Sequence, residues 1–141
     1  MKDISNLSKD GDDIIVPLGG EEGEVGIAMM GFSITVMLTK LDGSGFSVSV
    51  ELIDGKPCWF GRDSKNGIIG LGGDPTISRR HFSLTYSSAD RKVILQDSRY
   101  MSGTYLVYPD GRERIYGPVQ LHDGMVIGVA DKDFRFEKTG K

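Results

Sequence analysis

Apolar and polar residues alternate along much of this chain, and the alternation limits its fold more than any other feature. In the segments 33–41 (SITVMLTKL) and 46–52 (FSVSVEL), apolar residues recur at every second position. A period of two is typical of a β-strand with one buried face. An Asp-Gly pair at 42–43 separates the two segments, and such a pair is a strong signal for a turn. The sequence therefore predicts a β-hairpin over residues 33–52.

The rest of the chain repeats this pattern of short apolar runs and turns. Asp-Gly pairs recur at 54–55, 110–111 and 123–124, and 20 glycines in 141 residues is about twice the usual share. No window has the i, i+3, i+4, i+7 apolar spacing of an amphipathic helix. We therefore predict an all-β sandwich or barrel. The further strands are expected within 56–62, 81–86, 91–97, 103–108, 125–129 and 134–138, with Trp59, Phe60, Phe134 and Phe136 in the core.

The first 30 residues differ in composition from the rest. They hold two lysines against seven acidic residues, a net charge of −5, so the remaining residues sum to +2. An acidic stretch without aromatic residues buries too little apolar surface to offset the entropy of ordering it. We expect residues 1–30 to form a mobile tail, although its apolar fragments leave open that part of it adds an edge strand. A further hypothesis is that this tail folds back over the basic loops described below.

Composition also excludes several classes of function. Cys58 is the only cysteine, and no apolar run has the length of a membrane span or the form of a signal peptide. We expect a cytoplasmic or nuclear protein that does not act at a membrane. An isoelectric point near 5.3 argues against nucleic-acid binding. Two histidines and one cysteine show no zinc-ligand spacing, so neither a metal nor another cofactor is expected.

The stretch ISRRHF at 77–82 places two arginines between a serine and a histidine. Loops at one end of a sandwich vary freely and commonly carry function. The stretch stands between the long loop at 61–76 and the segment 97–106 (DSRYMSGTYL). Together these loops gather a set of side chains that suit an anion: Arg62, Lys65, Ser78, Arg79, Arg80, Arg99 and Ser102.

An enzyme is the less favoured interpretation of this cluster. Ser78 and His81 are three residues apart, and such residues point to opposite faces of an extended segment. The chain has no Gly-x-Ser-x-Gly, and the glycine-rich run at 67–73 opens no helix and is followed by no Lys-Ser pair. A phosphate monoester, by contrast, carries a charge of about −1.5 to −2 and three acceptor oxygens. Arginine forks and a serine hydroxyl satisfy such a group without catalysis.

Four motifs, taken in order, resemble the forkhead-associated (FHA) domain family. They are Phe-Gly-Arg at 60–62, Ser-Arg-Arg-His at 78–81, Ser-Gly-Thr at 102–104 with an aspartate at 97, and Leu-His-Asp-Gly at 121–124. The resemblance covers residues 31–138, which we take as the folded domain. It implies a β-sandwich of about eleven strands whose loops recognise phosphothreonine peptides. It agrees with the all-β pattern found independently.

The resemblance also implies roles for particular residues. Arg62 and Ser78 would hold the phosphate, and Arg79 would add a donor to the phosphate or the peptide. Ser102 and Gly103 would complete the phosphopeptide site. The structural residues at the site would be Gly61, His81 and Thr104.

One departure from the family pattern bears directly on function. Ser102 stands where the family usually has the asparagine that holds the peptide backbone, and its hydroxyl is shorter and offers fewer bonds. Two interpretations therefore stay open. In the first, the domain reads phosphothreonine on a phosphorylated partner protein in signalling. In the second, it is a divergent, phosphate-independent protein docking or scaffold module. Either would suit one module of a larger multidomain chain or complex.

Overall fold

The computed structural model describes residues 32–98 and 103–139. The acidic tail expected at 1–30 lies outside the described residues, so its mobility and its boundary stay predictions. The described residues form eleven strands and no helix, which confirms the all-β prediction. The strands are β1 (Ser33–Lys40), β2 (Ser47–Ile53), β3 (Cys58–Gly61), β4 (Ile69–Gly70), β5 (Phe82–Ser87), β6 (Lys92–Asp97), β7 (Thr104–Tyr108), β8 (Gly111–Arg114), β9 (Val119–Leu121), β10 (Val126–Val129) and β11 (Lys132–Lys138).

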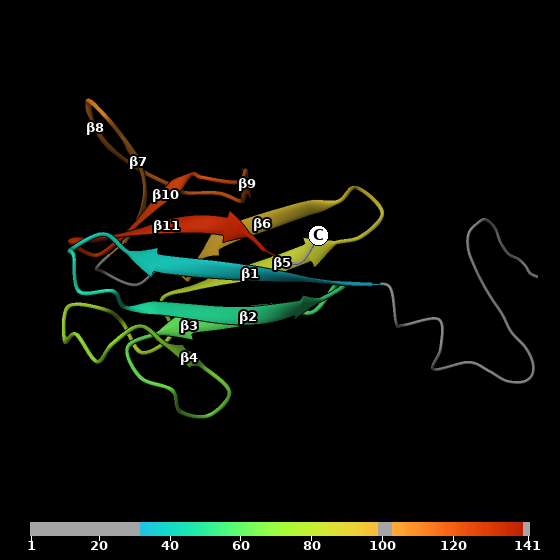
Figure 1. Cartoon of the computed structure of the whole chain (residues 1–141), viewed down its shortest axis with the longest axis horizontal. Coiled ribbons are helices and arrows are strands. Elements are labelled where there is room, and N and C mark those ends of the chain that lie inside the picture. Colours follow the sequence, from blue (N-terminus) through green and yellow to red (C-terminus); the bar gives the residue numbers. More distant parts are fainter. Residues whose placement is uncertain (1–31, 99–102, 140–141) are drawn as a thin grey trace, which may run out of the picture. The chain divides into compact units, whose positions relative to one another are not determined.

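The strands form two sheets of a sandwich. One sheet has six strands in the order β2-β1-β11-β10-β7-β8, and the other has five in the order β4-β3-β5-β6-β9 (Figure 1). Neighbouring strands are antiparallel, except that β3 and β4 run parallel. The hairpin predicted over 33–52 is confirmed, with Val36 opposite Val50 across β1 and β2. Its turn is closed by the Asp42 carboxylate, which accepts the Ser44 N–H at 2.9 Å.

The core lies between the sheets and is built from the alternating apolar positions. β1 buries Ile34, Val36 and Leu38, as its period of two predicts. Phe60 and Phe82 stack across β3 and β5 with ring centroids 5.0 Å apart. Phe60, Phe134 and Phe136 are fully buried, which confirms their prediction as core residues.

Trp59 is only half-buried, so its assignment to the core was wrong. Adjacent residues of a strand point to opposite faces, and Phe60 occupies the inner face of β3. The guanidinium of Arg80 lies over the outer Trp59 ring, 5.0 Å from its centroid.

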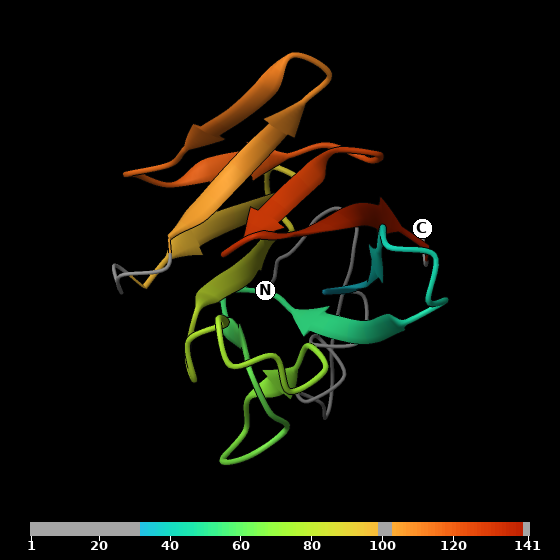
Figure 2. The same ribbon diagram turned by 90° about the vertical axis from the view of Figure 1, so that its left-hand side faces the viewer.

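The connections at the two ends of the five-stranded sheet have different lengths. At one end, the β2–β3 and β5–β6 turns are short and joined by hydrogen bonds, from Gly55 N to Tyr86 O and from Ser88 N to the Asp54 carboxylate. At the other end lie the long segments 62–68 and 71–81, before and after β4, which Figure 2 shows together in the lower part of the view. The sheet thus presents its long loops, and the predicted site residues on them, at one end.

Candidate functional site

The end of β3 packs directly against the segment that carries the two arginines. Arg62 N donates to Ser78 O at 3.0 Å, and His81 N donates to Phe60 O at 2.7 Å. A side chain on Gly61 would place its Cβ 1.8 Å from the carbonyl oxygen of Arg79. Only glycine permits this approach, and the approach is what brings Arg62 beside Ser78.

The Arg62 guanidinium is partly committed to the same loop. Its Nε donates to Ile77 O at 2.9 Å, and its Nη2 donates to Pro75 O at 3.2 Å. These bonds hold the β4–β5 loop against the end of β3. Among residues 32–98 and 103–139, Nη1 has no hydrogen-bond partner, so this nitrogen can donate to a ligand.

His81 joins two loops from the interior. Its ring is 1% exposed, its Nδ1 accepts the Ser78 N–H at 3.0 Å, and its Nε2 lies 2.6 Å from Gly103 O. A carbonyl only accepts, so the ring is neutral with its proton on Nε2. Burial lowers the pKa of His81 below its ordinary value of 6.5, against the bond to Gly103 and the nearby charge of Asp97, which raise it.

Gly103 and Thr104 lie at the start of β7, where the second of these loops ends. Gly103 is buried and has a φ of 76°, a conformation that favours glycine. The hydroxyl of Thr104, fully buried, donates to the Asp97 carboxylate at 2.5 Å. Ser102, predicted to contact the peptide, lies outside the described residues.

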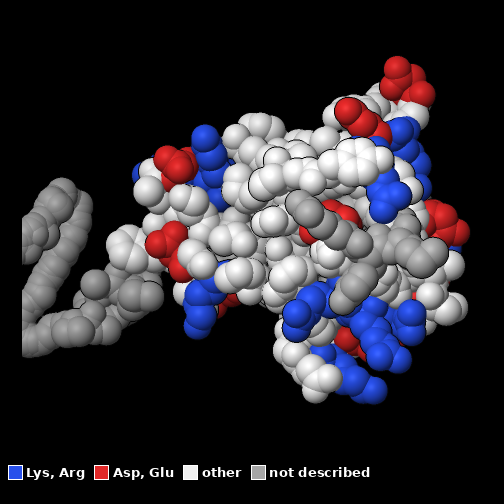
Figure 3. Space-filling model, turned by 180° about the vertical axis from the view of Figure 1, so that it is seen from behind, with Lys and Arg blue, Asp and Glu red and all other residues white. Residues whose placement is uncertain are grey.

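A pocket of about 470 Å³ opens between the two long loops. Four of its side chains are cationic and one is a carboxylate, and its lining is Arg62, Asp63, Lys65, Asn66, Ile68, Arg79 and Arg80. We call this the basic pocket. Figure 3, which views the molecule from behind relative to Figure 1, shows Lys and Arg side chains gathered at the lower right. This is the end that bears the loops around β4.

The predicted site residues are distributed unequally around the basic pocket. Arg62 and Arg79 line it, and Arg79 makes no hydrogen bond or ion pair with any other described residue. Ser78 is half-buried and bonds through its backbone to Arg62 and His81, but it does not belong to the lining. The His81 ring joins Gly103 to Ser78 by accepting from Ser78 N and bonding to Gly103 O.

The order of these elements agrees with a known domain model. The family model of the FHA domain matches residues 58–130, more than half of the chain. The chain belongs to the FHA domain family. FHA domains are non-catalytic and typically bind phosphothreonine peptides.

Solved structures support the FHA fold at low sequence identity. One comes from a structural and functional analysis of phosphothreonine-dependent FHA domain interactions, with 24% identity, 76% of this chain and 99% of that chain covered, and a TM-score of 0.57. The FhaA FHA domain complexed with the intracellular domain of Rv3910 has 25% identity, coverages of 72% and 99%, and a TM-score of 0.55. Mycobacterium tuberculosis EmbR in complex with a low-affinity phosphopeptide has 22% identity, coverages of 77% and 25%, and a TM-score of 0.59. The search of curated proteins found no match to the chain.

A turn that the sequence analysis did not single out forms one wall of the basic pocket in this FHA domain. Ile68 N donates to Lys65 O at 3.0 Å, and Asn66 and Gly67 between them have φ values of 55° and 79°. Positive φ at both central residues is the mark of a type I′ turn, for which Asn-Gly is the preferred pair. The Asn-Gly dipeptide at 66–67 was the signal that could have located this wall.

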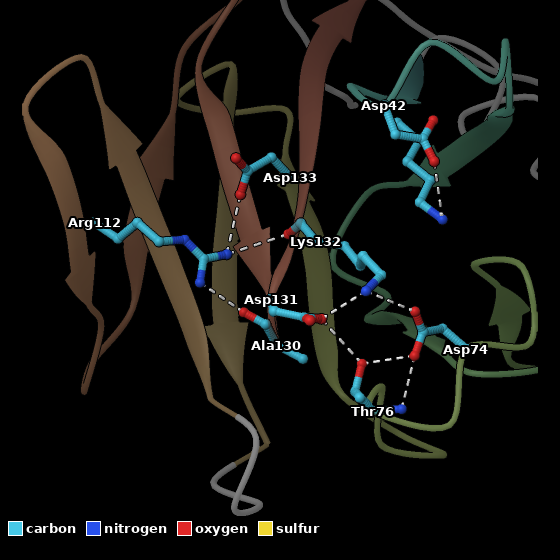
Figure 4. Close-up of polar contacts among 9 residues, drawn as sticks. Asp42, Asp74, Thr76, Arg112, Ala130, Asp131, Lys132 and Asp133 are labelled. Carbon is cyan, nitrogen blue, oxygen red and sulfur yellow. Dashed lines mark hydrogen bonds and ion pairs between the residues drawn. The ribbon is translucent and has the colours of Figure 1, made fainter.

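A second network, shown in Figure 4, ties the β4–β5 loop of the FHA domain to the other sheet. Asp74 accepts the Thr76 N–H at 2.8 Å and the Thr76 hydroxyl at 2.7 Å, and Lys132 of β11 reaches Asp74 at 3.1 Å and Asp131 at 2.9 Å. The Thr76 bonds, with Lys132, hold the pKa of Asp74 at about 2. Spacing in the sequence gives no indication of this link, because Asp74 and Lys132 are far apart along the chain.

Other kinds of site are not evident in the part of the chain that the structure describes. No group of three or more His, Cys, Asp or Glu side chains there could hold a metal ion. The same residues include no helix with the length and hydropathy to cross a bilayer. Burial raises the pKa of the Cys58 thiol, which favours its protonated form.

Proposed function

We propose that this domain binds a phosphothreonine-containing segment of a partner protein at the basic pocket. The observation that carries the proposal is the convergence of Arg62 and Arg79, from two loops, on one pocket in a chain of the FHA family. The structural neighbour from the work on phosphothreonine-dependent interactions supports the same ligand class.

The chemistry of the proposed ligand matches the donors. Arg62 offers Nη1, Arg79 offers its whole guanidinium, and the Ser78 hydroxyl makes no hydrogen bond within the described residues. Hydrogen bonds to a charged group contribute about 1.5–3 kcal/mol each. Two or three of them, less the entropy lost on binding, give an affinity on the order of micromolar.

The peptide backbone would be held less firmly than the phosphate. Ser102 replaces the asparagine expected from the family pattern, and a lost backbone contact costs about 1–3 kcal/mol. We expect a phosphate-dependent but weak grip, in which the phosphate supplies most of the binding free energy.

A second candidate function is phosphate-independent docking of a partner protein. The Arg62 guanidinium favours this function. Its Nε and Nη2 donate hydrogen bonds to the carbonyls of Ile77 and Pro75, so the side chain stabilises the loop. Ser78 outside the pocket lining favours it as well.

To separate the two candidates, the domain is titrated with a phosphothreonine peptide library and with unphosphorylated and phosphoserine versions of the same peptides. Fluorescence anisotropy measures binding. Arg79→Ala removes a pocket donor that has no other partner in the described residues, and we expect binding about tenfold weaker. Ser78→Ala keeps both backbone bonds and removes only the hydroxyl. Lys92→Ala, at the other end of the sheet, is the control for the lost charge.

Phosphate-dependent binding that weakens with rising ionic strength and with Arg79→Ala supports the proposal. Equal affinity for phosphorylated and unphosphorylated peptides would reject it. A partner bound equally tightly with and without phosphate would support the docking function instead.

A further inference from the structure

The basic pocket carries more positive charge than one phosphate neutralises. Four cations and one carboxylate give its lining a formal net charge of +3. A phosphothreonine brings about −1.5 to −2 at neutral pH. The remaining charge of about +1 matches one carboxylate better than a second phosphate.

Lys65 is the first residue of a hydrogen-bonded turn at the pocket. The type I′ turn Lys65–Ile68 fixes the backbone on which the side chain stands. The loop is tied again where Gly70 N donates to the Ser64 hydroxyl at 3.0 Å. Lys65 forms no ion pair with another described residue, including Asp63, the one carboxylate of the pocket lining.

Arg80 is fixed at the same pocket by a different contact. Its guanidinium lies over the Trp59 ring on the outer face of β3. This contact is with the ring, and the Arg80 guanidinium makes no hydrogen bond or ion pair with another described residue that would occupy its N–H donors. Arg80 is therefore oriented without its hydrogen-bonding capacity being used.

From this arrangement we infer that the domain selects phosphothreonine segments that carry a Glu or Asp close to the phosphothreonine, and that Lys65 and Arg80 bind that carboxylate. The inference rests on the proposed function and divides the basic pocket into two parts. Arg62 and Arg79 hold the phosphate. Lys65 and Arg80 determine specificity for the neighbouring residue.

The test uses two phosphothreonine peptides that differ only in having Glu or Gln on both sides of the phosphothreonine. Isothermal titration calorimetry measures both against the wild type, the Lys65→Gln/Arg80→Gln variant and each single variant. The control is Lys56→Gln/Lys92→Gln, which removes the same charge from the β2–β3 turn and from the first residue of β6, at the other end of the sheet. Both control lysines are exposed and have no ion pair with other described residues.

The wild type and the control are expected to bind the Glu peptide about fivefold more tightly than the Gln peptide. The pocket variant should bind both peptides equally, and both more weakly than the wild type because it lacks two of the positive charges of the pocket lining. Equal binding of both phosphopeptides by the wild type, each tighter than its unphosphorylated form, overturns this inference alone. A preference that survives in the pocket variant, or disappears in the control, also overturns it. If phosphorylation itself adds no affinity, the proposed function fails first.

Discussion

The Nε2 atom of His81 lies 2.6 Å from the carbonyl oxygen of Gly103, across 22 residues of sequence. The other ring nitrogen accepts the Ser78 N–H at 3.0 Å, so one neutral imidazole joins the loop before β5 to the start of β7. His81→Ala would leave both backbone groups without this partner in the interior. We expect it to lower the free energy of unfolding by about 2–4 kcal/mol, measured by urea denaturation.

The same arrangement predicts a pH dependence. The pKa of His81 is lowered below 6.5 in the folded state, so the unfolded chain takes up the proton first as pH falls. Its contribution to stability is therefore complete above pH 6.5 and declines below it. The unfolding free energy of the wild type should fall over this range. His122→Gln, which removes the exposed histidine, should keep that slope, whereas an unchanged slope in His81→Ala would contradict the assignment.

Gly61→Ala should destabilise the domain severely. The added Cβ would lie 1.8 Å from Arg79 O and 2.9 Å from Ser78 O, and backbone cannot move aside without separating β3 from the loop. We expect a loss of about 3 kcal/mol in urea denaturation. Gly117→Ala is the matched control because no atom lies within 4 Å of its added Cβ. Similar stability of both variants would contradict this prediction, because it would show that the backbone at Ser78 and Arg79 can move away from the added Cβ.

Asp74→Ala should weaken the tie between the β4–β5 loop and β11. It removes the acceptor of the Thr76 N–H and one of the two carboxylates that Lys132 contacts, and we expect a cost of about 1 kcal/mol or less at pH 7. The folded pKa of about 2 lies below the ordinary 3.8, so the difference from wild type should be present above pH 3.8 and vanish toward pH 2. Denaturation at a series of pH values measures it, with Glu113→Ala on exposed β8 as control.

Thr104→Val tests the buried hydroxyl against simple packing. It keeps the shape of the side chain but removes the bond to the Asp97 carboxylate, at an expected cost of about 1.5–3 kcal/mol. Thr104→Ser keeps the hydroxyl and should lose less. If the serine variant proved the less stable of the two in thermal denaturation, the methyl group would matter more than the bond.

The long strands could be predicted because the apolar alternation and the turn residues that specify each strand lie within a few residues of one another. The alternation of Ile34, Val36 and Leu38 and the Asp-Gly turn after them specified the first hairpin without any distant partner. The sequence did not predict β4, β8 and β9: β4 and β9 have only two and three residues, and β8 (GRER) contains no large apolar residue. They form because longer neighbours offer them backbone partners, which is a tertiary effect.

The site was predicted as a set of residues but not as a geometry. The sequence motifs placed Arg62, Arg79 and His81 among the important residues. The motifs gave no indication that the Arg62 side chain donates hydrogen bonds to the carbonyls of Pro75 and Ile77. These bonds depend on how close β3 approaches the loop, and that distance is fixed by packing at Gly61.

Hydrogen bonds hold the backbone around the basic pocket: they close the type I′ turn at Lys65 and join Arg62 to the β4–β5 loop. The backbone around the pocket loses its conformational entropy when the domain folds and not when a ligand binds. An anion arriving there should associate rapidly and without a slow rearrangement step, so its residence time would be set by how fast the contacts break.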